Sequence, residues 1–113
     1  MTATPVAQPI LVTDWRALPA ALRGATVALG NFDGVHLGHA AVLRAAHAAR
    51  PDLPLAALTF EPHPREHFRP EDPPFRLTLL PAKARALGGL GAAVIYAIPF
   101  DATLAAMPAE AFV

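Results

Sequence analysis

Residues 25–41 read ATVALGNFDGVHLGHAA, an apolar run followed by a glycine-rich segment and the start of an alanine-rich one. The run of residues 25–29 contains β-branched and other apolar side chains, which predicts a buried strand of a parallel sheet. Residues 40–50 are rich in alanine and predict a helix. The three glycines among residues 30–39 allow the backbone to turn sharply and to approach a ligand closely. This order of strand, glycine-rich turn and helix predicts an α/β fold.

The helix that follows residues 30–39 begins with several features of a phosphate-binding site. The first N–H groups of a helix have no partner within it and lie at the positive end of its dipole. His36 and His39 are three residues apart, so both side chains can point to one side and donate hydrogen bonds to phosphate oxygens. A glycine-rich turn alone is common, and a histidine near a helix start is often a cap or a packing residue. The ordered pattern G-x-F-D-G-V-H-x-G-H between a strand and a helix favours phosphate binding.

Residues 30–39 resemble the H-x-G-H motif of the nucleotidylyltransferase superfamily. Residues 31–36, Asn-Phe-Asp-Gly-Val-His, more specifically resemble the bacterial bifunctional riboflavin kinase/FMN adenylyltransferases, also called FAD synthetases. Relatives that make coenzyme A, NAD or CDP-activated alcohols share the two histidines and more often carry another residue, commonly proline, at the position of Gly34. The resemblance extends from about Leu18 to the last residue. It implies a Rossmann-like nucleotidylyltransferase fold, with a parallel sheet flanked by helices.

The resemblance also implies an activity, the transfer of AMP from ATP to FMN with release of pyrophosphate. Mg²⁺ would accompany the ATP, and the sequence assigns no protein ligand to the metal. His36 and His39 would be the catalytic residues, because they would contact the ATP phosphates. The residues that would bind ATP are Gly30, Asn31, Phe32, Asp33, His36, Gly38 and His39.

A second motif follows another apolar run, residues 53–60, which predicts a second buried strand. Residues 60–64 are Phe-Glu-Pro-His-Pro, and Phe68 follows four residues later. Two prolines around a histidine usually make only a stiff, extended turn. The motif nevertheless resembles the flavin-site loop of FAD synthetases, and rigid prolines beside an aromatic ring would form an apolar wall for an isoalloxazine ring. The resemblance therefore implies flavin-binding roles for Pro62, His63, Pro64 and Phe68.

The rest of the sequence predicts shorter elements on both sides of these motifs. They are strands at residues 9–12 and 92–98, a short helix from Thr13 or Asp14 to Leu22, a helix with Lys83 and Arg85, and a short helix with Leu104. The helix after the glycine-rich turn is expected from about Leu37 to Ala49, with Val42, Ala45 and Ala49 on one side and polar side chains on another. Lys83 and Arg85 are expected on a solvated helix face, and the resemblance places Phe112 in a segment with a pocket aromatic residue.

The composition argues against several other classes of protein. Nine basic and nine acidic residues give a formal net charge of zero, so the basic field that nucleic acids or anionic membranes require is missing. There is no cysteine, which excludes disulfides and thiolate metal sites. Residues 1–8 lack the features of a signal peptide, and no segment approaches the ~20 apolar residues of a membrane span. We therefore expect a cytoplasmic protein with a loose arm at residues 1–8 and small-molecule substrates.

Two parts of the family pattern are missing, namely a serine/threonine-rich phosphate motif that ends in arginine and a riboflavin kinase module. Residues 1–113 are therefore expected to be the N-terminal part of a single, incomplete FMN adenylyltransferase domain, ending in the first turn of a helix after Pro108. Two alternatives stay open: another nucleotidylyltransferase with a different phosphorylated acceptor, and an inactive fragment that at best binds nucleotide. A zinc site made of the five histidines is weaker, because His36 and His39 fit a phosphate motif.

Overall fold

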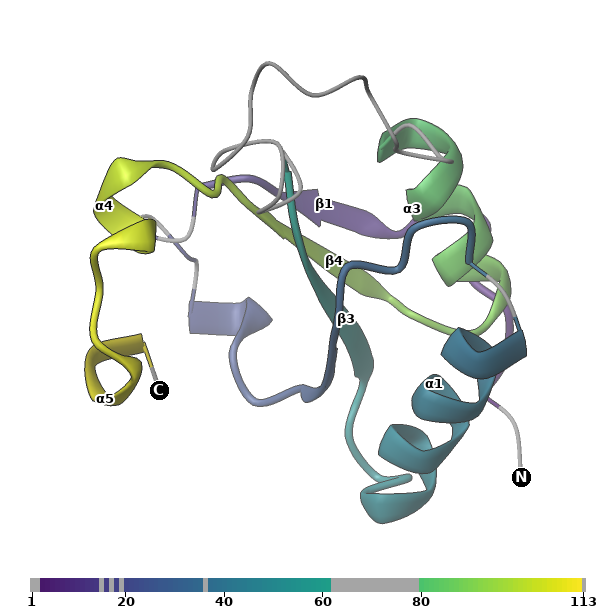
Figure 1. The fold of residues 1–113 in the computed structure, drawn as a ribbon. Helices are drawn as coiled ribbons and strands as arrows, with labels where there is room; N and C mark the ends of the chain where they lie inside the picture. Colours follow the sequence, from purple (N-terminus) through teal and green to yellow (C-terminus); the bar gives the residue numbers. More distant parts are fainter. Residues whose placement is uncertain are drawn as a thin grey trace.

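The computed structural model describes residues 3–14, 16, 18, 20–35, 37–61 and 80–112. Within them, four strands form one parallel sheet in the order β1-β4-β3-β2 (Figure 1). The strands are β1 (Ile10–Val12), β2 (Thr26–Leu29), β3 (Leu55–Phe60) and β4 (Val94–Ile98). The helices are the 3-10 turn η2 (Ala20–Leu22), α1 (Leu37–Ala49), α3 (Leu80–Gly89), α4 (Ala102–Ala105) and α5 (Ala109–Phe112). The predicted α/β fold with a parallel sheet and flanking helices is confirmed.

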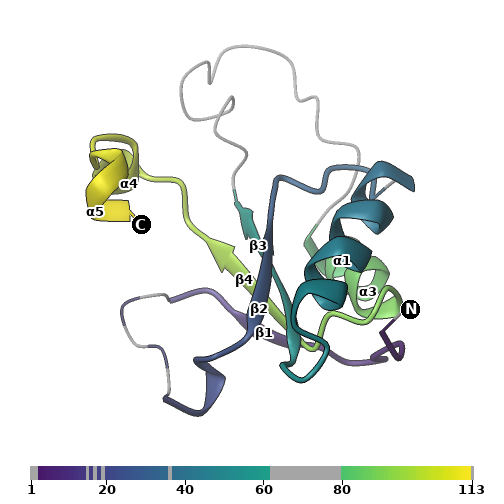
Figure 2. The ribbon, with the colours of Figure 1, turned by 90° about the horizontal axis from the view of Figure 1, so that it is seen from below.

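The sheet separates two apolar cores. Helices α1 and α3 lie on one side of it, and η2, α4 and α5 lie on the other (Figure 2). The core beneath α1 and α3 contains Ala28, Phe32, Leu43, Leu55, Ala57, Leu87, Ala92 and Ile95. The core on the opposite face contains Val12, Ala56, Val94, Tyr96, Ile98 and Leu104. Because both faces of β4 are covered, all five of its residues are buried, which explains its continuous apolar sequence.

Helix α1 has the predicted bounds but packs through a different side. Its buried residues are Ala40 and Leu43, which are three residues apart and so share one face. Val42 is 46% exposed, so the side that it shares with Ala45 and Ala49 does not pack on the sheet. His47, expected at the surface, is half-buried.

The N-terminal arm is not loose, contrary to prediction. The N–H of Val6 donates a hydrogen bond to the carbonyl of Gly88 at 2.7 Å, and the N–H of Ile10 donates to the carbonyl of Ala93 at 2.9 Å. The arm therefore lies along the end of α3. The helix expected from residue 13 or 14 to Leu22 is not continuous, because Leu18 is not helical; among the described residues of this segment, Arg16 and η2 have a 3-10 conformation.

Candidate functional site

The turn after β2 lies beside the end of β3 at one edge of the sheet. The N–H of Gly30 donates a hydrogen bond to the carbonyl of Leu58 at 3.1 Å, and the hydroxyl of Thr59 donates to the carbonyl of Asn31 at 2.8 Å. Both motifs therefore begin at the carboxyl ends of adjacent parallel strands, where ligands of such sheets bind. The predicted flavin-binding residues Pro62, His63, Pro64 and Phe68 lie outside the described residues.

The backbone of the turn between β2 and α1 is strained. Phe32 has a φ of 53° and Val35 a φ of 39°, while Gly34 has a φ of 80°. In the described part of the chain, Phe32 and Val35 are the non-glycine residues with positive φ. Each such conformation costs about 1–3 kcal/mol and persists where the surrounding structure enforces it, often at a ligand site. Both strained residues belong to the predicted phosphate-binding turn, which makes this turn the candidate site.

The ring of Phe32 connects the turn to the first turn of α1. The ring is buried in the core beneath α1 and α3, and its centroid lies 5.2 Å from that of the His39 imidazole, with 67° between the planes. A Cβ added to Gly30 would lie 3.4 Å from the ring of Phe32, an ordinary van der Waals distance, so the ring packs directly beside this glycine. This edge-on arrangement is a favourable one for two aromatic rings, so the contact favours the observed orientation of the His39 ring.

The described residues among the other predicted ATP-binding residues lie in the turn and in the first turn of α1. Gly38 and His39 are in the first turn of α1, as the sequence predicts, and His39 is half-buried. Asp33 is half-buried in the turn. His36, the second predicted catalytic residue, lies outside the described residues, so its pairing with His39 stays a prediction.

Asn31 contributes both its backbone and its side chain to the turn. Its carbonyl oxygen accepts two hydrogen bonds, from the Thr59 hydroxyl at 2.8 Å and from Lys83 Nζ at 2.9 Å. Its side-chain Oδ1 is buried and accepts no hydrogen bond from the residues that the structure describes. A buried acceptor in this state is suited to a donor from a ligand or a water molecule.

Lys83 of α3 is a site residue that sequence reasoning missed. The prediction that Lys83 lies on a solvated face is wrong, because its side chain is only 2% exposed. Its Nζ donates to Glu61 Oε1 at 2.8 Å, to the carbonyl of Asn31 at 2.9 Å and to Thr59 Oγ1 at 3.3 Å. Arg85 is exposed, as predicted. The spacing of Lys83 from Leu80 and Leu87, by three and four residues, could have placed it on the face that packs against the sheet.

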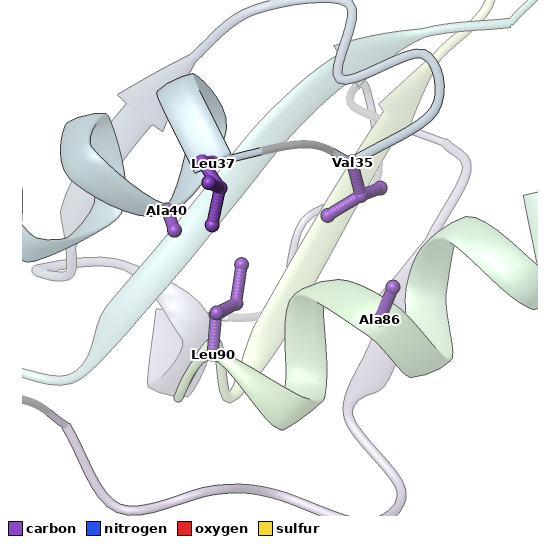
Figure 3. Close-up of a pocket in the computed structure, with 5 residues that line it drawn as sticks. All are labelled: Val35, Leu37, Ala40, Ala86 and Leu90. Atoms are coloured by element: carbon purple, nitrogen blue, oxygen red, sulfur yellow. The ribbon is translucent and has the colours of Figure 1, made fainter.

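Two hollows lie near the turn, and both are mainly apolar. One, of about 420 Å³, lies between α1 and α3, where Val35 of the turn and Leu37 of α1 point toward Leu90, the residue that follows α3 (Figure 3). Apolar walls of this kind do not suit a phosphate group. The other, of about 580 Å³, lies on the opposite face of the sheet and includes Leu29, Leu58 and Phe112 in its walls.

Three aromatic rings gather at the end of β3. The ring of Phe60 lies 5.5 Å from that of Phe100 and 6.3 Å from that of Phe112. Phe112, which also lines the larger of these two hollows, thus belongs to this aromatic group.

The described residues contain no group of three or more histidine, cysteine, aspartate or glutamate side chains that could hold a metal ion. Glu61, a carboxylate at the edge of the site, is paired with Lys83. Within the same ranges, no helix is both long and apolar enough to cross a membrane.

The sequence of this chain matches one family of proteins. The family model for FAD synthetase matches residues 18–113, and the chain belongs to this family. It is 42% identical over 94 residues to the bifunctional riboflavin kinase/FMN adenylyltransferase of Haemophilus influenzae, covering 81% of this chain and 30% of that protein. The protein of the same name from Escherichia coli K12 is 38% identical over 92 residues, covering 80% of this chain and 29% of its own length. The chain thus spans less than a third of these curated relatives.

A solved structure also matches this fold. The crystal structure of a protein described as a macrolide-efflux protein from Streptococcus pneumoniae superposes with a TM-score of 0.72 at 26% sequence identity. The match covers 93% of this chain and 36% of that one. The arrangement of the sheet and helices is therefore shared with a chain of considerably greater length.

Proposed function

We propose that this chain is part of an enzyme that makes FAD from ATP and FMN. The observation that carries the proposal is the strained turn at the carboxyl edge of β2 and β3, with His39 held beside it by the ring of Phe32. Membership of the FAD synthetase family and the names of the relatives favour this reaction over other adenylyl transfers.

In the proposed reaction, an oxygen of the FMN phosphate attacks the α-phosphorus of ATP. A new P–O bond forms in line with the bond to the bridging oxygen, which breaks, and pyrophosphate leaves with the electron pair. The attacking oxygen is already anionic, so no side chain has to become covalent or remove a proton. Catalysis then rests on positioning and on stabilising charge at the phosphates.

The residues of the turn would bind different parts of ATP. His36 and His39 would donate hydrogen bonds to the phosphates, and the first turn of α1 would add N–H groups and a favourable dipole. The backbone and side chains of Gly30, Asn31, Phe32, Asp33 and Gly38 would form the remainder of the ATP site. Mg²⁺ would be held mainly by ATP oxygens and water, as this ion prefers.

The flavin would lie at the same edge of the sheet. Pro62, His63, Pro64 and Phe68 would supply a rigid wall for the isoalloxazine ring. The hollow lined by Leu29, Leu58 and Phe112 supports this placement, since its volume of about 580 Å³ is within the usual range for small-molecule sites.

In the same proposal, residues 1–113 form the N-terminal part of one FMN adenylyltransferase domain, in a protein that also phosphorylates riboflavin to FMN. The protein acts in the cytoplasm on ATP and FMN, without a nucleic-acid or membrane partner, consistent with its net charge of zero.

The proposal is tested by measuring FAD formation from ATP and FMN in a protein that contains this chain, with a panel of other phosphorylated acceptors for comparison. His36→Ala should lower the rate about 100-fold or more, since it removes a phosphate donor. His47→Ala, a histidine further along α1, is the matched control and should keep the rate. Unchanged FAD formation in His36→Ala would refute the catalytic role, and preference for another acceptor would refute the substrate.

The flavin site needs a separate test. Phe68→Ala should raise the KM for FMN more than the KM for ATP, because the ring is assigned to the flavin wall. An equal effect on both would argue against that wall. Calorimetric titration of the 113-residue chain with ATP·Mg²⁺ and then FMN distinguishes a binding-competent chain from an inactive scaffold.

A further inference from the structure

The buried ammonium group of Lys83 has a complete set of partners. Its three N–H donors match three acceptors: Glu61 Oε1, the carbonyl of Asn31 and Thr59 Oγ1. Thr59 in turn donates its hydroxyl hydrogen to the same carbonyl of Asn31. The group thus joins α3, the end of β3 and the turn after β2 at one point.

Stability alone does not explain a lysine at this place. Taking an ammonium group and a carboxylate out of water is costly, and a well-packed apolar side chain of similar volume often serves a fold equally well. The side chains of Lys83 and Glu61 are only 2% and 12% exposed. We therefore look for the role of this charged pair in the geometry of the turn, which Lys83 contacts through the carbonyl of Asn31.

The contact with Asn31 acts on the strained backbone. The carbonyl of Asn31 and the N–H of Phe32 belong to one rigid peptide plane. The φ angle of Phe32 describes the rotation of this plane about the N–Cα bond, and the buried ring fixes the other side of that bond. Holding the carbonyl therefore holds φ at its unfavourable value of 53°.

We propose that Lys83 is a positioning residue for the phosphate-binding turn. It fixes the peptide plane between Asn31 and Phe32, and through the ring of Phe32 it sets the orientation of His39. Through Glu61 it also fixes the beginning of the segment predicted to bind flavin. The binding of ATP phosphates and of flavin by these parts rests on the proposed function, whereas the effect of Lys83 on the backbone of the turn does not.

The test compares Lys83→Met with the double variant Glu61→Gln/Lys83→Met and with Arg85→Met. Lys83→Met removes the donors and takes from Glu61 the ammonium group that lies 2.8 Å away. The double variant removes the carboxylate charge as well, so its stability should return toward that of the unmodified protein. Arg85→Met makes the same kind of change on the exposed face of α3 and is the matched control.

Two readouts separate positioning from stability. The first is the NMR chemical shift of the His39 ring protons, which the edge-on ring of Phe32 perturbs. It should move in both Lys83 variants and stay in place in Arg85→Met. The second is the kinetics of FAD formation, where kcat should fall roughly 10–100-fold in the double variant while the protein remains folded.

A double variant with the original His39 shift and the original kcat would overturn the proposal. Should both Lys83 variants fail to fold, Lys83→Arg takes their place, since it keeps a positive charge beside Glu61 but replaces the compact ammonium group by a planar guanidinium, which changes the bond to the Asn31 carbonyl. An unmoved His39 shift in that variant would also overturn the proposal. If the unmodified protein makes no FAD, the proposed function fails, and the His39 shift still decides the role of Lys83.

Discussion

The hydroxyl of Tyr96, in the buried strand β4, donates a hydrogen bond to the backbone carbonyl of Leu22, 74 positions earlier in the chain. Leu22 ends η2, and its side chain packs against the core that contains Tyr96. The bond therefore attaches the segment before β2 to the face of the sheet opposite α1 and α3. It also fixes where the chain enters β2, the strand that leads into the candidate site.

Tyr96→Phe tests this attachment with little change in shape. The ring stays, but the carbonyl of Leu22 loses its donor in a partly buried place. We expect the free energy of unfolding to fall by about 1 kcal/mol, as measured by urea denaturation. A variant as stable as the unmodified protein would mean that water replaces the hydroxyl without cost.

The same residue predicts a pH dependence at high pH. Burial raises the pKa of Tyr96 above its ordinary value of 10.0, because it disfavours the phenolate. The folded protein then binds the phenolic proton more tightly than the unfolded chain does. The contribution to stability is therefore complete below pH 10.0 and is lost as pH rises through the raised pKa.

The measurement is direct because Tyr96 is the single tyrosine of the chain. An absorbance titration of the phenolate should have its midpoint above 10.0 in the folded protein and return to about 10.0 in denaturant. Equal midpoints in the two states would contradict the effect of burial.

The main elements of this fold could be predicted because their sequence signals are local and strong. The apolar runs that became β2, β3 and β4 are bounded by glycine or proline and lie within two residues of the predicted limits. The glycine-rich turn placed α1 correctly, since the turn itself marks the helix start. The beginning of both motifs at one edge of the sheet followed from the parallel pairing of β2 and β3.

What the sequence did not reveal depends on contacts between distant residues. The acceptors of Lys83 are in Glu61, Thr59 and Asn31, which are 22 to 52 positions away in the sequence. The residues next to Lys83 in the sequence do not indicate these contacts. The docking of the arm likewise depends on the bond from Val6 to Gly88. The strain at Phe32 is invisible in the sequence, because a non-glycine residue gives no sign of positive φ.

Gly88 and Gly89, adjacent at the end of α3, should respond in opposite directions to substitution by alanine. A Cβ at Gly88 would lie 2.4 Å from the carbonyl oxygen of Val6, so Gly88→Ala should displace the arm and cost about 1–3 kcal/mol. A Cβ at Gly89 would meet nothing within 4 Å, so Gly89→Ala should stabilise the helix by up to about 1 kcal/mol. Denaturant unfolding of both variants checks this pair, and effects of the same sign would argue against a docked arm.

Phe32→Leu should damage ATP binding more than its cost in stability explains. The smaller side chain leaves a gap in the core and removes the edge-on contact with His39, and we expect a loss of roughly 1–3 kcal/mol in the free energy of unfolding. Leu43→Ala is the matched control, because Leu43 lies in the same core and is as fully buried. Calorimetric titration with ATP·Mg²⁺, on variants shown to be folded by circular dichroism, should give weaker binding in Phe32→Leu alone. Equal weakening in both variants would mean that the ring acts only through the core, and that the orientation of His39 does not depend on it.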